Sequence, residues 1–319
     1  MKLPLLVLVG PTAVGKTAIS VMLARRLGAE IISGDSMQVY RSMDIGTAKI
    51  TPAEMQGVPH HMIDIKGPDE PFSVAEFQAR VDELVREIHG RGRLPFLVGG
   101  TGLYVRAVVQ NYTFTEMDAD HALRESLARE EEVHGPGHLH SKLAQVDPAA
   151  AAKLHPGDLR RIVRALEVYH TTGAPISETQ TAARSEPRYD DLMVGLTMDR
   201  DLLYRRIDLR VAQMLESGWI DEVRGLLRRY PPTTQALEAI GYRELVWYLR
   251  GLLSHGEAVA LIQRNTRRFA KRQFTWFRRD ERITWFDVTA PERRDSIVNE
   301  IANLVQGKWL GGVESVFPD

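Results

Sequence analysis

A phosphate-loop pattern lies close to the start of the chain. Residues 10–17 read GPTAVGKT, with the apolar run 5–9 before them and an amphipathic segment, 18–27, behind. In this pattern the glycines let backbone N–H groups turn toward a phosphate, and the following helix points its positive end at the same anion. Lys16 is expected to reach the terminal phosphate, and Thr17 offers a hydroxyl to phosphate or to Mg²⁺. The pattern predicts phosphate binding and leaves open whether the ligand is a nucleotide or a diphosphate.

The predicted diphosphate- or nucleotide-binding residues are those of this loop, Gly10, Pro11, Thr12, Ala13, Val14, Gly15, Lys16 and Thr17. Thr17 is the predicted metal ligand.

Composition limits the protein classes that need to be considered. A chain of 319 residues, 44% hydrophobic and 26% charged, suits a large globular domain with an insertion. The absence of cysteine excludes disulfides and thiolate zinc sites. The net charge of −1 gives no sign of a nucleic-acid binder, so any such sign must come from the distribution of charge.

The apolar start of the chain could be mistaken for a secretory leader. It lacks a small-residue cleavage site and runs directly into the phosphate loop. No other apolar run approaches membrane-spanning length. We therefore expect a cytoplasmic protein that does not engage a membrane, and we find no dimerisation signal, which favours a monomer.

Strand and helix patterns alternate in the first third of the chain. Buried strands are expected at 30–33 and 94–98, and a helix at 74–89, where apolar residues recur at helical spacing. This order predicts an α/β fold with a parallel sheet core of the nucleotide-kinase-like, phosphate-loop type. In such folds the functional loops follow the carboxyl ends of the strands.

The composition changes near residue 114. An acidic helical stretch, 116–132, is followed by loops and by a helix at 159–171, so residues 114–188 are predicted to form an inserted helical subdomain. Residues 1–113 and 189–319 then form the core, with a returning strand at 192–196. Later elements are expected at 201–216, 220–229, 235–250, 257–279 and 291–305 as helices, and at 283–286 as a strand.

Polar residues follow two of the predicted strands. Asp35 and Ser36 close the strand at 30–33, and Thr101 lies in the glycine-rich turn 99–102 after the strand at 94–98. A carboxylate at Asp35 suits a general base or an indirect Mg²⁺ ligand, and it equally suits a helix N-cap. The glycines of the turn are a weak signal, because glycines also permit ordinary tight turns.

Two adjacent histidines, His60 and His61, form a third polar cluster. Neighbouring residues point in different directions, which is poor spacing for a single metal ion. Phosphate binding or a cavity wall remains possible for one of them. For at least one, the better prediction is a buried histidine whose ring bonds the backbone.

Basic residues gather in the C-terminal third. Eight arginines and lysines fall between residues 264 and 282, against Asp280 and Glu281. Five of them are predicted to form a basic stripe along one helix, while Phe269, Trp276 and Phe277 are expected to pack inward; the stripe comprises Arg264, Arg267, Arg268, Lys271 and Arg272. Such a one-sided stripe in a near-neutral protein is typical of polyanion binding.

Two further arginine clusters are candidates. Arg206 and Arg210 lie four residues apart on one helical face, and their planar guanidinium groups suit a diphosphate. Ordinary surface pairing is the alternative. Arg160, Arg161 and Arg164 in the inserted subdomain offer a second basic surface.

Assembled in order, these segments resemble bacterial tRNA dimethylallyltransferases, also called tRNA isopentenyltransferases. The matching stretches run through nearly the whole chain. They are GPTAVGKT at 10–17, GDSMQVYRSMDIGTAK at 34–49, VPHHMIDI at 58–65, FSVAEF at 72–77, LVGGTGLYVRA at 97–107, HPGDLRRIVRALEV at 155–168, MLESGWIDEV at 214–223, AIGYRE at 239–244 and TRRFAKRQFTWFR at 266–278. Gly157 departs from the asparagine expected in the turn at 155–158.

The resemblance implies transfer of the dimethylallyl group of dimethylallyl diphosphate to the exocyclic amine of the adenine 3′ of a tRNA anticodon, with Mg²⁺ as cofactor. The phosphate loop would then hold the diphosphate leaving group rather than ATP. Asp35 would accept the amine proton, and Thr17, Thr101, Arg206 and Arg210 complete the expected catalytic set. The residues expected to contact the tRNA anticodon stem-loop are Asp35, Ser36, Met37, Gln38, Thr101, Arg124, Arg160, Arg161, Arg164, Arg267, Arg268 and Lys271.

Three other functions are compatible with parts of the sequence. A small-molecule kinase explains residues 10–17 but not the insertion or the basic stripe. An enzyme that prenylates free AMP or ADP uses the same chemistry and does not need the stripe. An RNA-binding NTP switch would not require Asp35 as a base.

Overall fold

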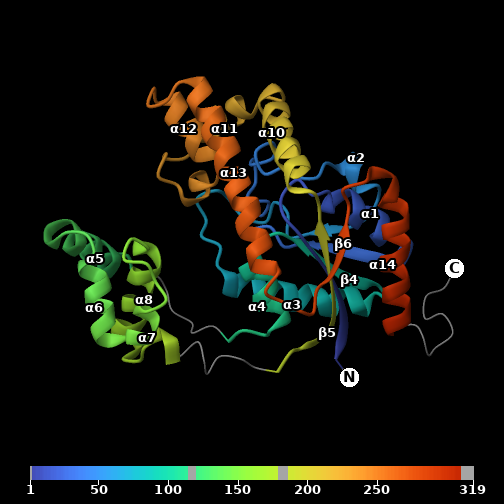
Figure 1. The fold of residues 1–319 in the computed structure, drawn as a ribbon, viewed down its shortest axis with the longest axis horizontal. Helices are drawn as coiled ribbons and strands as arrows, with labels where there is room; N and C mark the ends of the chain where they lie inside the picture. Colours follow the sequence, from blue (N-terminus) through green and yellow to red (C-terminus); the bar gives the residue numbers. More distant parts are fainter. Residues whose placement is uncertain (1, 114–119, 179–185, 310–319) are drawn as a thin grey trace. The chain divides into compact units, whose positions relative to one another are not determined.

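A parallel six-stranded sheet forms the centre of the chain (Figure 1). The computed structural model describes residues 2–113, 120–178 and 186–309. The sheet order is β3-β2-β4-β1-β5-β6, and every neighbouring pair is parallel. The strands are β1 (Leu3–Val9), β2 (Ala29–Ser33), β3 (His60–His61), β4 (Leu94–Gly99), β5 (Tyr189–Thr197) and β6 (Thr284–Asp287). The predicted α/β fold with a parallel core is confirmed.

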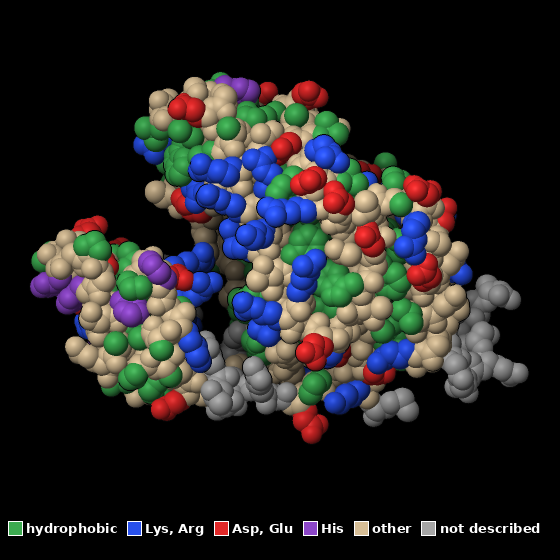
Figure 2. Space-filling view, viewed as in Figure 1, with side chains coloured by type: hydrophobic (Ala, Val, Ile, Leu, Met, Phe, Trp, Pro, Cys, Tyr) green, Lys and Arg blue, Asp and Glu red, His purple; other side chains and the backbone are tan. Residues whose placement is uncertain are grey.

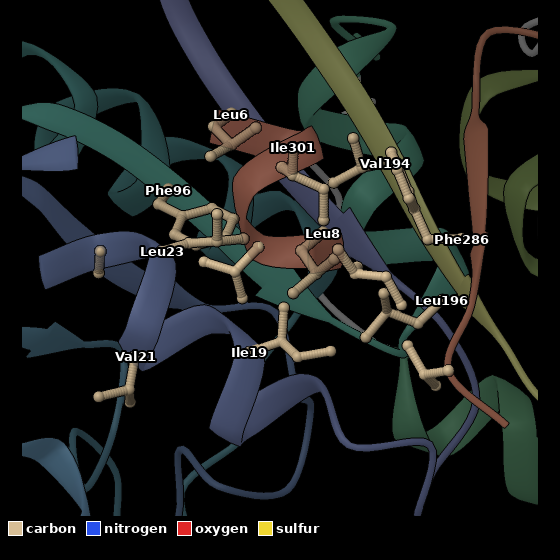
Figure 3. Packing of buried hydrophobic residues seen from close by; sticks show 14 of the residues in the cluster. Leu6, Leu8, Ile19, Val21, Leu23, Phe96, Val194, Leu196, Phe286 and Ile301 are labelled. Carbon is tan, nitrogen blue, oxygen red and sulfur yellow. The ribbon is translucent and has the colours of Figure 1, made fainter. Parts of the chain in front are cut away.

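Helices cover both faces of the sheet at strand β1. Its side chains alternate, so Leu6 and Leu8 enter one buried cluster while Leu5, Val7 and Val9 enter another. The first cluster includes α1 (Lys16–Leu27) and α14 (Arg294–Trp309); Figure 3 shows Ile19, Leu23 and Ile301 around Leu8. The second cluster includes α3 (Val74–Gly90) and α4 (Gly102–Val109). A strand buried on both faces explains the continuous apolar run in the sequence.

Most of the remaining helices of this unit lie at the predicted positions, but the short helix Pro52–Met55 was not predicted. The unit's other elements are α2 (Pro52–Met55), α10 (Arg200–Glu216), α11 (Trp219–Leu227), α12 (Tyr242–Leu249) and α13 (His255–Phe277), with 3-10 turns at Gln235–Glu238 and Pro291–Arg293. The single helix predicted at 235–250 is wrong, because the chain turns at Gly241 with a φ of 91°. A Cβ there would collide with the Trp219 ring, so the turn depends on glycine.

A third buried cluster joins α10, α11, α12 and α13 to the loop after β2. Trp219 and Tyr242 lie at its centre, with ring centroids 5.7 Å apart in an edge-on arrangement. From the loop it takes Val39, Tyr40 and Met43. The loop that carries the polar residues after β2 is therefore held against a helical layer.

The chain divides into two compact units, Met1–Val109 with Pro187–Asp319, and Gln110–Glu186. The second unit holds α5 (His121–His134), α6 (His138–Val146), α7 (Pro148–Ala151) and α8 (Leu159–Thr172). Its own core includes Leu127, Leu143 and Ile162. The insertion predicted at 114–188 overlaps this unit almost completely, and its acidic start at 116–119 lies outside the described residues.

No helix within the described ranges is both long and apolar enough to cross a membrane.

Candidate active site

The phosphate loop joins β1 to α1 with a backbone that glycine makes possible. Gly15 caps α1 with a φ of 105°, and Ala13 has a φ of 64°. At Gly10 a Cβ would lie 2.9 Å from the carbonyl oxygen of Leu196 on β5. The first turn of α1 contains no acidic side chain, so its positive end is not neutralised locally. The loop therefore has the geometry that its sequence predicts for an anion site.

Lys16 lies inside this loop. Its Nζ donates hydrogen bonds to the carbonyl oxygens of Gly10 and Pro11, both at 2.8 Å. Burial lowers the pKa of Lys16 to about 8; the charge of Asp35 acts against this shift, and that of Arg210 adds to it. The three charged groups are therefore electrostatic neighbours, although they come from separate parts of the chain.

Asp35 and Thr101 follow adjacent strands of the sheet, β2 and β4. Asp35 Oδ1 accepts hydrogen bonds from the N–H groups of Met37 at 2.8 Å and Gln38 at 3.3 Å. Thr101 Oγ1 accepts the N–H of Ser36 at 3.2 Å. Asp35 is not a helix N-cap, because no helix follows it; Oδ1 instead closes a turn of the loop after β2. Among the described residues no hydrogen bond to Oδ2 of Asp35 is formed, which leaves that oxygen for a ligand proton.

A cavity of about 360 Å³ opens beside these groups. Its polar wall includes Thr12, Asp35, Thr101 and Arg210, and further predicted site residues on its wall are Ala13, Ser36 and Met37. Its apolar wall comes from the third buried cluster and includes Val211, Met214, Trp219 and Tyr242. A polar end beside a phosphate loop and an apolar wall suit a ligand with a charged head and a hydrocarbon tail.

The structure distinguishes between the two arginines of α10. Arg210 lines the cavity and is half-buried, and this burial lowers its pKa, while the charges of Asp35 and Glu54 favour its charged form. Arg206, one turn earlier and half-buried, is not part of the cavity wall. Arg210 is therefore the better candidate for the diphosphate.

Glu222 on α11 is a structural residue of the site that sequence reasoning missed. Its carboxylate accepts the N–H groups of Asp44 and Ile45 at 2.8 Å, that of Gly46 at 3.2 Å, and the hydroxyl of Tyr242 at 2.6 Å. Gly46 contributes to the cavity wall. Since three consecutive N–H groups bind one carboxylate, Glu222 fixes the loop on that side of the cavity.

Helix α13 displays most of the predicted basic stripe. Arg264, Arg268, Lys271 and Arg272 are exposed, and Figure 2 shows Lys and Arg side chains gathered along the face where α13 lies. Arg267 differs, because it is half-buried and bonded to Asp208 of α10 at 2.5 Å. Arg272 also lines the cavity, so the stripe reaches the candidate site.

The aromatic residues of α13 behave in three ways. Phe277 is buried, as predicted. Phe269 is half-buried and lines the cavity. The prediction for Trp276 is wrong, since 37% of this residue is exposed. Its indole lies against the backbone of Gly102, and the guanidinium of Arg106 lies 5.2 Å from the ring centroid.

In the second unit, several candidate arginines serve the fold. Arg124 and Arg164 both bond the buried carboxylate of Glu167, at 2.9 and 2.7 Å. Burial raises the pKa of Glu167, but these arginines and the N–H of Asp120 outweigh it and lower the pKa to about 2. Arg161 pairs with Asp158, and Arg160 is exposed. At Gly157 the turn closes through its N–H, which bonds Nδ1 of His155.

The histidine pair is explained by local contacts. His60 Nδ1 lies 2.8 Å from the carbonyl oxygen of Val58, and His61 Nε2 lies 2.7 Å from the carboxylate of Glu30. The predicted bond to the backbone is confirmed for His60, although this residue is half-buried rather than buried. Within the described ranges no group of three or more His, Asp or Glu side chains could hold a metal ion.

Comparison with known proteins identifies the family. Residues 38–280 match the family described as IPP transferase. A tRNA dimethylallyltransferase of Symbiobacterium thermophilum is 72% identical over 309 residues, 97% of both chains. This chain belongs to the IPP transferase family. Its members are prenyltransferases, so the chain is a transferase enzyme.

Two solved structures extend the likeness to three dimensions. The tRNA isopentenylpyrophosphate transferase of Bacillus halodurans is 52% identical, with a TM-score of 0.73 over 96% of this chain and 97% of that one. A eukaryotic dimethylallyltransferase acting on tRNA is 28% identical, with a TM-score of 0.82 over 98% of this chain and 80% of that one. The family likeness therefore includes the fold.

Proposed function

We propose that this enzyme transfers the dimethylallyl group of dimethylallyl diphosphate to the exocyclic amine of the adenine 3′ of the anticodon in tRNA, giving N6-isopentenyladenosine. The observation that carries the proposal is the meeting of a phosphate loop, Asp35, Thr101 and Arg210 at one cavity with an apolar wall. The names of the relatives support the acceptor and the transferred group.

The reaction exchanges one bond for another. The adenine N6 attacks the allylic carbon, the carbon–oxygen bond to the diphosphate breaks with its electron pair leaving on the diphosphate, and the N6 proton passes to Asp35. A free carboxylate oxygen suits this base, because proton removal must accompany attack by a weakly nucleophilic aromatic amine. The phosphate loop, Lys16 and Arg210 stabilise the charge that develops on the leaving group.

Mg²⁺ is the proposed cofactor. Thr17 is exposed at the start of α1, and its hydroxyl is of the type that P-loop proteins offer to this ion. The described residues form no all-protein metal cage, which fits an ion held by one side chain together with substrate phosphates and water. When bound, the ion neutralises diphosphate charge.

For tRNA, the proposed contacts lie along α13 and at the cavity mouth. The exposed residues of the basic stripe would bind loop phosphates, and the adenine must leave the anticodon stack to enter the cavity, at a cost of a few kcal/mol. Arg160 and Arg161 are the proposed tRNA contacts of the second unit, whereas Arg124 and Arg164 form ion pairs with Glu167.

The monomeric state and the cytoplasmic location of the protein stay predictions.

The test is incubation with unmodified tRNA, Mg²⁺ and dimethylallyl diphosphate, followed by nucleoside mass spectrometry, with AMP as a parallel acceptor. We expect an isopentenyl mass gain on adenosine from tRNA and none on AMP. Gain on AMP alone would indicate the free-nucleotide enzyme. Gain on neither, together with thermal stabilisation by ATP but not by dimethylallyl diphosphate, would indicate a kinase.

A further inference from the structure

Gln273 on α13 bridges two loops of the active site. Its side chain is buried, with 6% of the residue exposed. Oε1 accepts the N–H of Thr12 in the phosphate loop at 2.8 Å, and Nε2 donates to the carbonyl oxygen of Gly100 at 3.0 Å. Thr101, which lines the cavity, is the next residue along the chain. One amide group thus joins the loop after β1 to the turn after β4.

The chemistry of the two partners dictates the orientation of this amide. If the amide were flipped, its NH₂ group would face the N–H of Thr12, and its oxygen would face the carbonyl oxygen of Gly100. Neither pair can form a hydrogen bond. A glutamine therefore matches this place in a way that no ionised carboxylate or hydrocarbon of equal size does. It also engages the Thr12 N–H and removes it from the amides that could bind phosphate.

Two glycines of the turn 99–102 lie in close contact with α13. A Cβ at Gly100 would collide with Nε2 of Gln273, and a Cβ at Gly102 would collide with the indole of Trp276. These glycines therefore allow a close approach of the helix to the backbone on both sides of Thr101. The same helix exposes Arg268 and Lys271 of the basic stripe.

We propose that Gln273 is a positioning residue for the transfer reaction, which holds the phosphate loop and the Thr101 turn in fixed relation to each other and to α13. This inference rests on the proposed function. Gln273 is not part of the cavity wall, and its two bonds are to the backbone groups of Thr12 and Gly100, through which it would act. Misplacement of reacting groups by about 1 Å can reduce a rate about 100-fold, so loss of this bridge should affect the chemical step and diphosphate binding, and spare tRNA affinity.

Two variants separate positioning from simple packing. Gln273→Met preserves length and approximate volume while it removes both hydrogen bonds. Gln273→Glu keeps an acceptor for the Thr12 N–H but sets an oxygen against the carbonyl of Gly100. The matched control is Gln263→Met on the same helix, since Gln263 is half-buried and bonds only weakly, at 3.5 Å, to the carbonyl of Asp208.

The measurements are kcat with tRNA and dimethylallyl diphosphate, Kd for inorganic pyrophosphate by calorimetry, Kd for tRNA, and thermal unfolding. We expect both Gln273 variants to lower kcat by 10-fold to 100-fold, and Gln273→Met to weaken pyrophosphate binding about 10-fold. We expect tRNA affinity within about twofold of wild type, and Gln263→Met to match wild type throughout.

Unchanged kcat and pyrophosphate affinity in folded Gln273→Met would overturn the proposal. An equal loss of tRNA and pyrophosphate binding in folded Gln273→Met would also overturn it. If Gln273→Met does not fold, the same criteria apply to kcat and pyrophosphate binding of Gln273→Glu. If wild type transfers nothing, the proposed function fails, and pyrophosphate affinity still decides the role of Gln273.

Discussion

Single residues at the site combine structural and chemical tasks. Asp35 shows this most directly, because Oδ1 holds the start of the following loop through the N–H groups of Met37 and Gln38. The second oxygen is the one proposed to accept the amine proton. A substitution that preserves the first task and removes the second can therefore isolate the chemistry.

Asp35→Asn is that substitution. An asparagine keeps an oxygen acceptor for the two loop N–H groups but is not a base, so we expect kcat to fall by about 10³-fold with tRNA affinity retained. Single-turnover transfer and tRNA binding measure the two effects. Activity within threefold of wild type would exclude Asp35 as the base and would favour the RNA-binding switch.

Lys16 gives a prediction for the pH dependence of diphosphate binding. Its pKa is lowered to about 8 by burial, and a bound anion must raise it again. Below pH 8 the amine is already charged and the affinity should not depend on this group. Above pH 8 binding must take up a proton, so affinity should fall by up to tenfold per pH unit. Pyrophosphate calorimetry in buffers of different ionisation enthalpy measures this uptake.

Lys16→Arg is the matched control, because a guanidinium stays charged throughout this pH range. It experiences the same titration of the ligand, so the difference between the two proteins reports Lys16 alone. Identical pH profiles would show that Lys16 does not titrate on binding.

At the scale of elements, α13 does three things along one helix. Its exposed basic residues offer a phosphate-binding surface, Arg272 and Phe269 line the cavity, and Gln273 bonds two loops of the site. The helical period places these residues on different faces within a few turns. In the proposed function, this one helix would connect tRNA binding with the diphosphate site.

The basic stripe predicts the salt dependence of tRNA binding. Replacement of Arg264, Arg268 and Lys271 by glutamine should weaken tRNA binding and reduce the slope of log K against log salt by about 2, because each lost phosphate contact removes about 0.7 to 0.9. Arg267 is left intact, since its bond to Asp208 gives it a structural role.

The control for this experiment carries the same charge change elsewhere. Arg86, Arg93 and Arg294 are exposed on parts of the core that do not line the cavity. Their replacement by glutamine should leave the slope within about 0.3 of wild type. Equal slopes for the two triple variants would remove the stripe from the tRNA interface.

At the scale of the whole molecule, the chain forms two units with separate cores. The described residues that line the cavity all belong to Met1–Val109 and Pro187–Asp319. The unit Gln110–Glu186 has its own buried cluster and its own buried ion network at Glu167. Diphosphate binding should therefore not depend on the second unit.

Replacement of residues 110–186 by a short Gly-Ser linker tests this division. The remaining unit should fold and bind pyrophosphate within about threefold of wild type, since its clusters are complete, whereas tRNA affinity should fall by at least 10-fold through loss of Arg160 and Arg161. Calorimetry measures the Kd for pyrophosphate, and filter binding measures the Kd for tRNA. Loss of pyrophosphate binding in a folded variant would show that the insertion supports the diphosphate site.

Local sequence signals predicted most elements of the fold. The helix α3 begins and ends within one residue of the prediction, because Ser73 caps it and apolar residues recur along one face. The prediction failed at 235–250 and at Trp276. At 235–250 the helix is interrupted at Gly241, where a Cβ would collide with the ring of Trp219, a residue distant in sequence.

The sequence by itself determined the parallel α/β core, the phosphate loop and the residues that follow β2 and β4, because period, glycine spacing and strand ends are local properties of the chain. Only the tertiary structure showed that Arg210 lines the cavity and Arg206 does not. It also showed that Arg124 and Arg164 form ion pairs with Glu167, and that Gln273 and Glu222 bond the loops of the site. These choices depend on contacts between residues far apart in sequence, for which no local pattern exists.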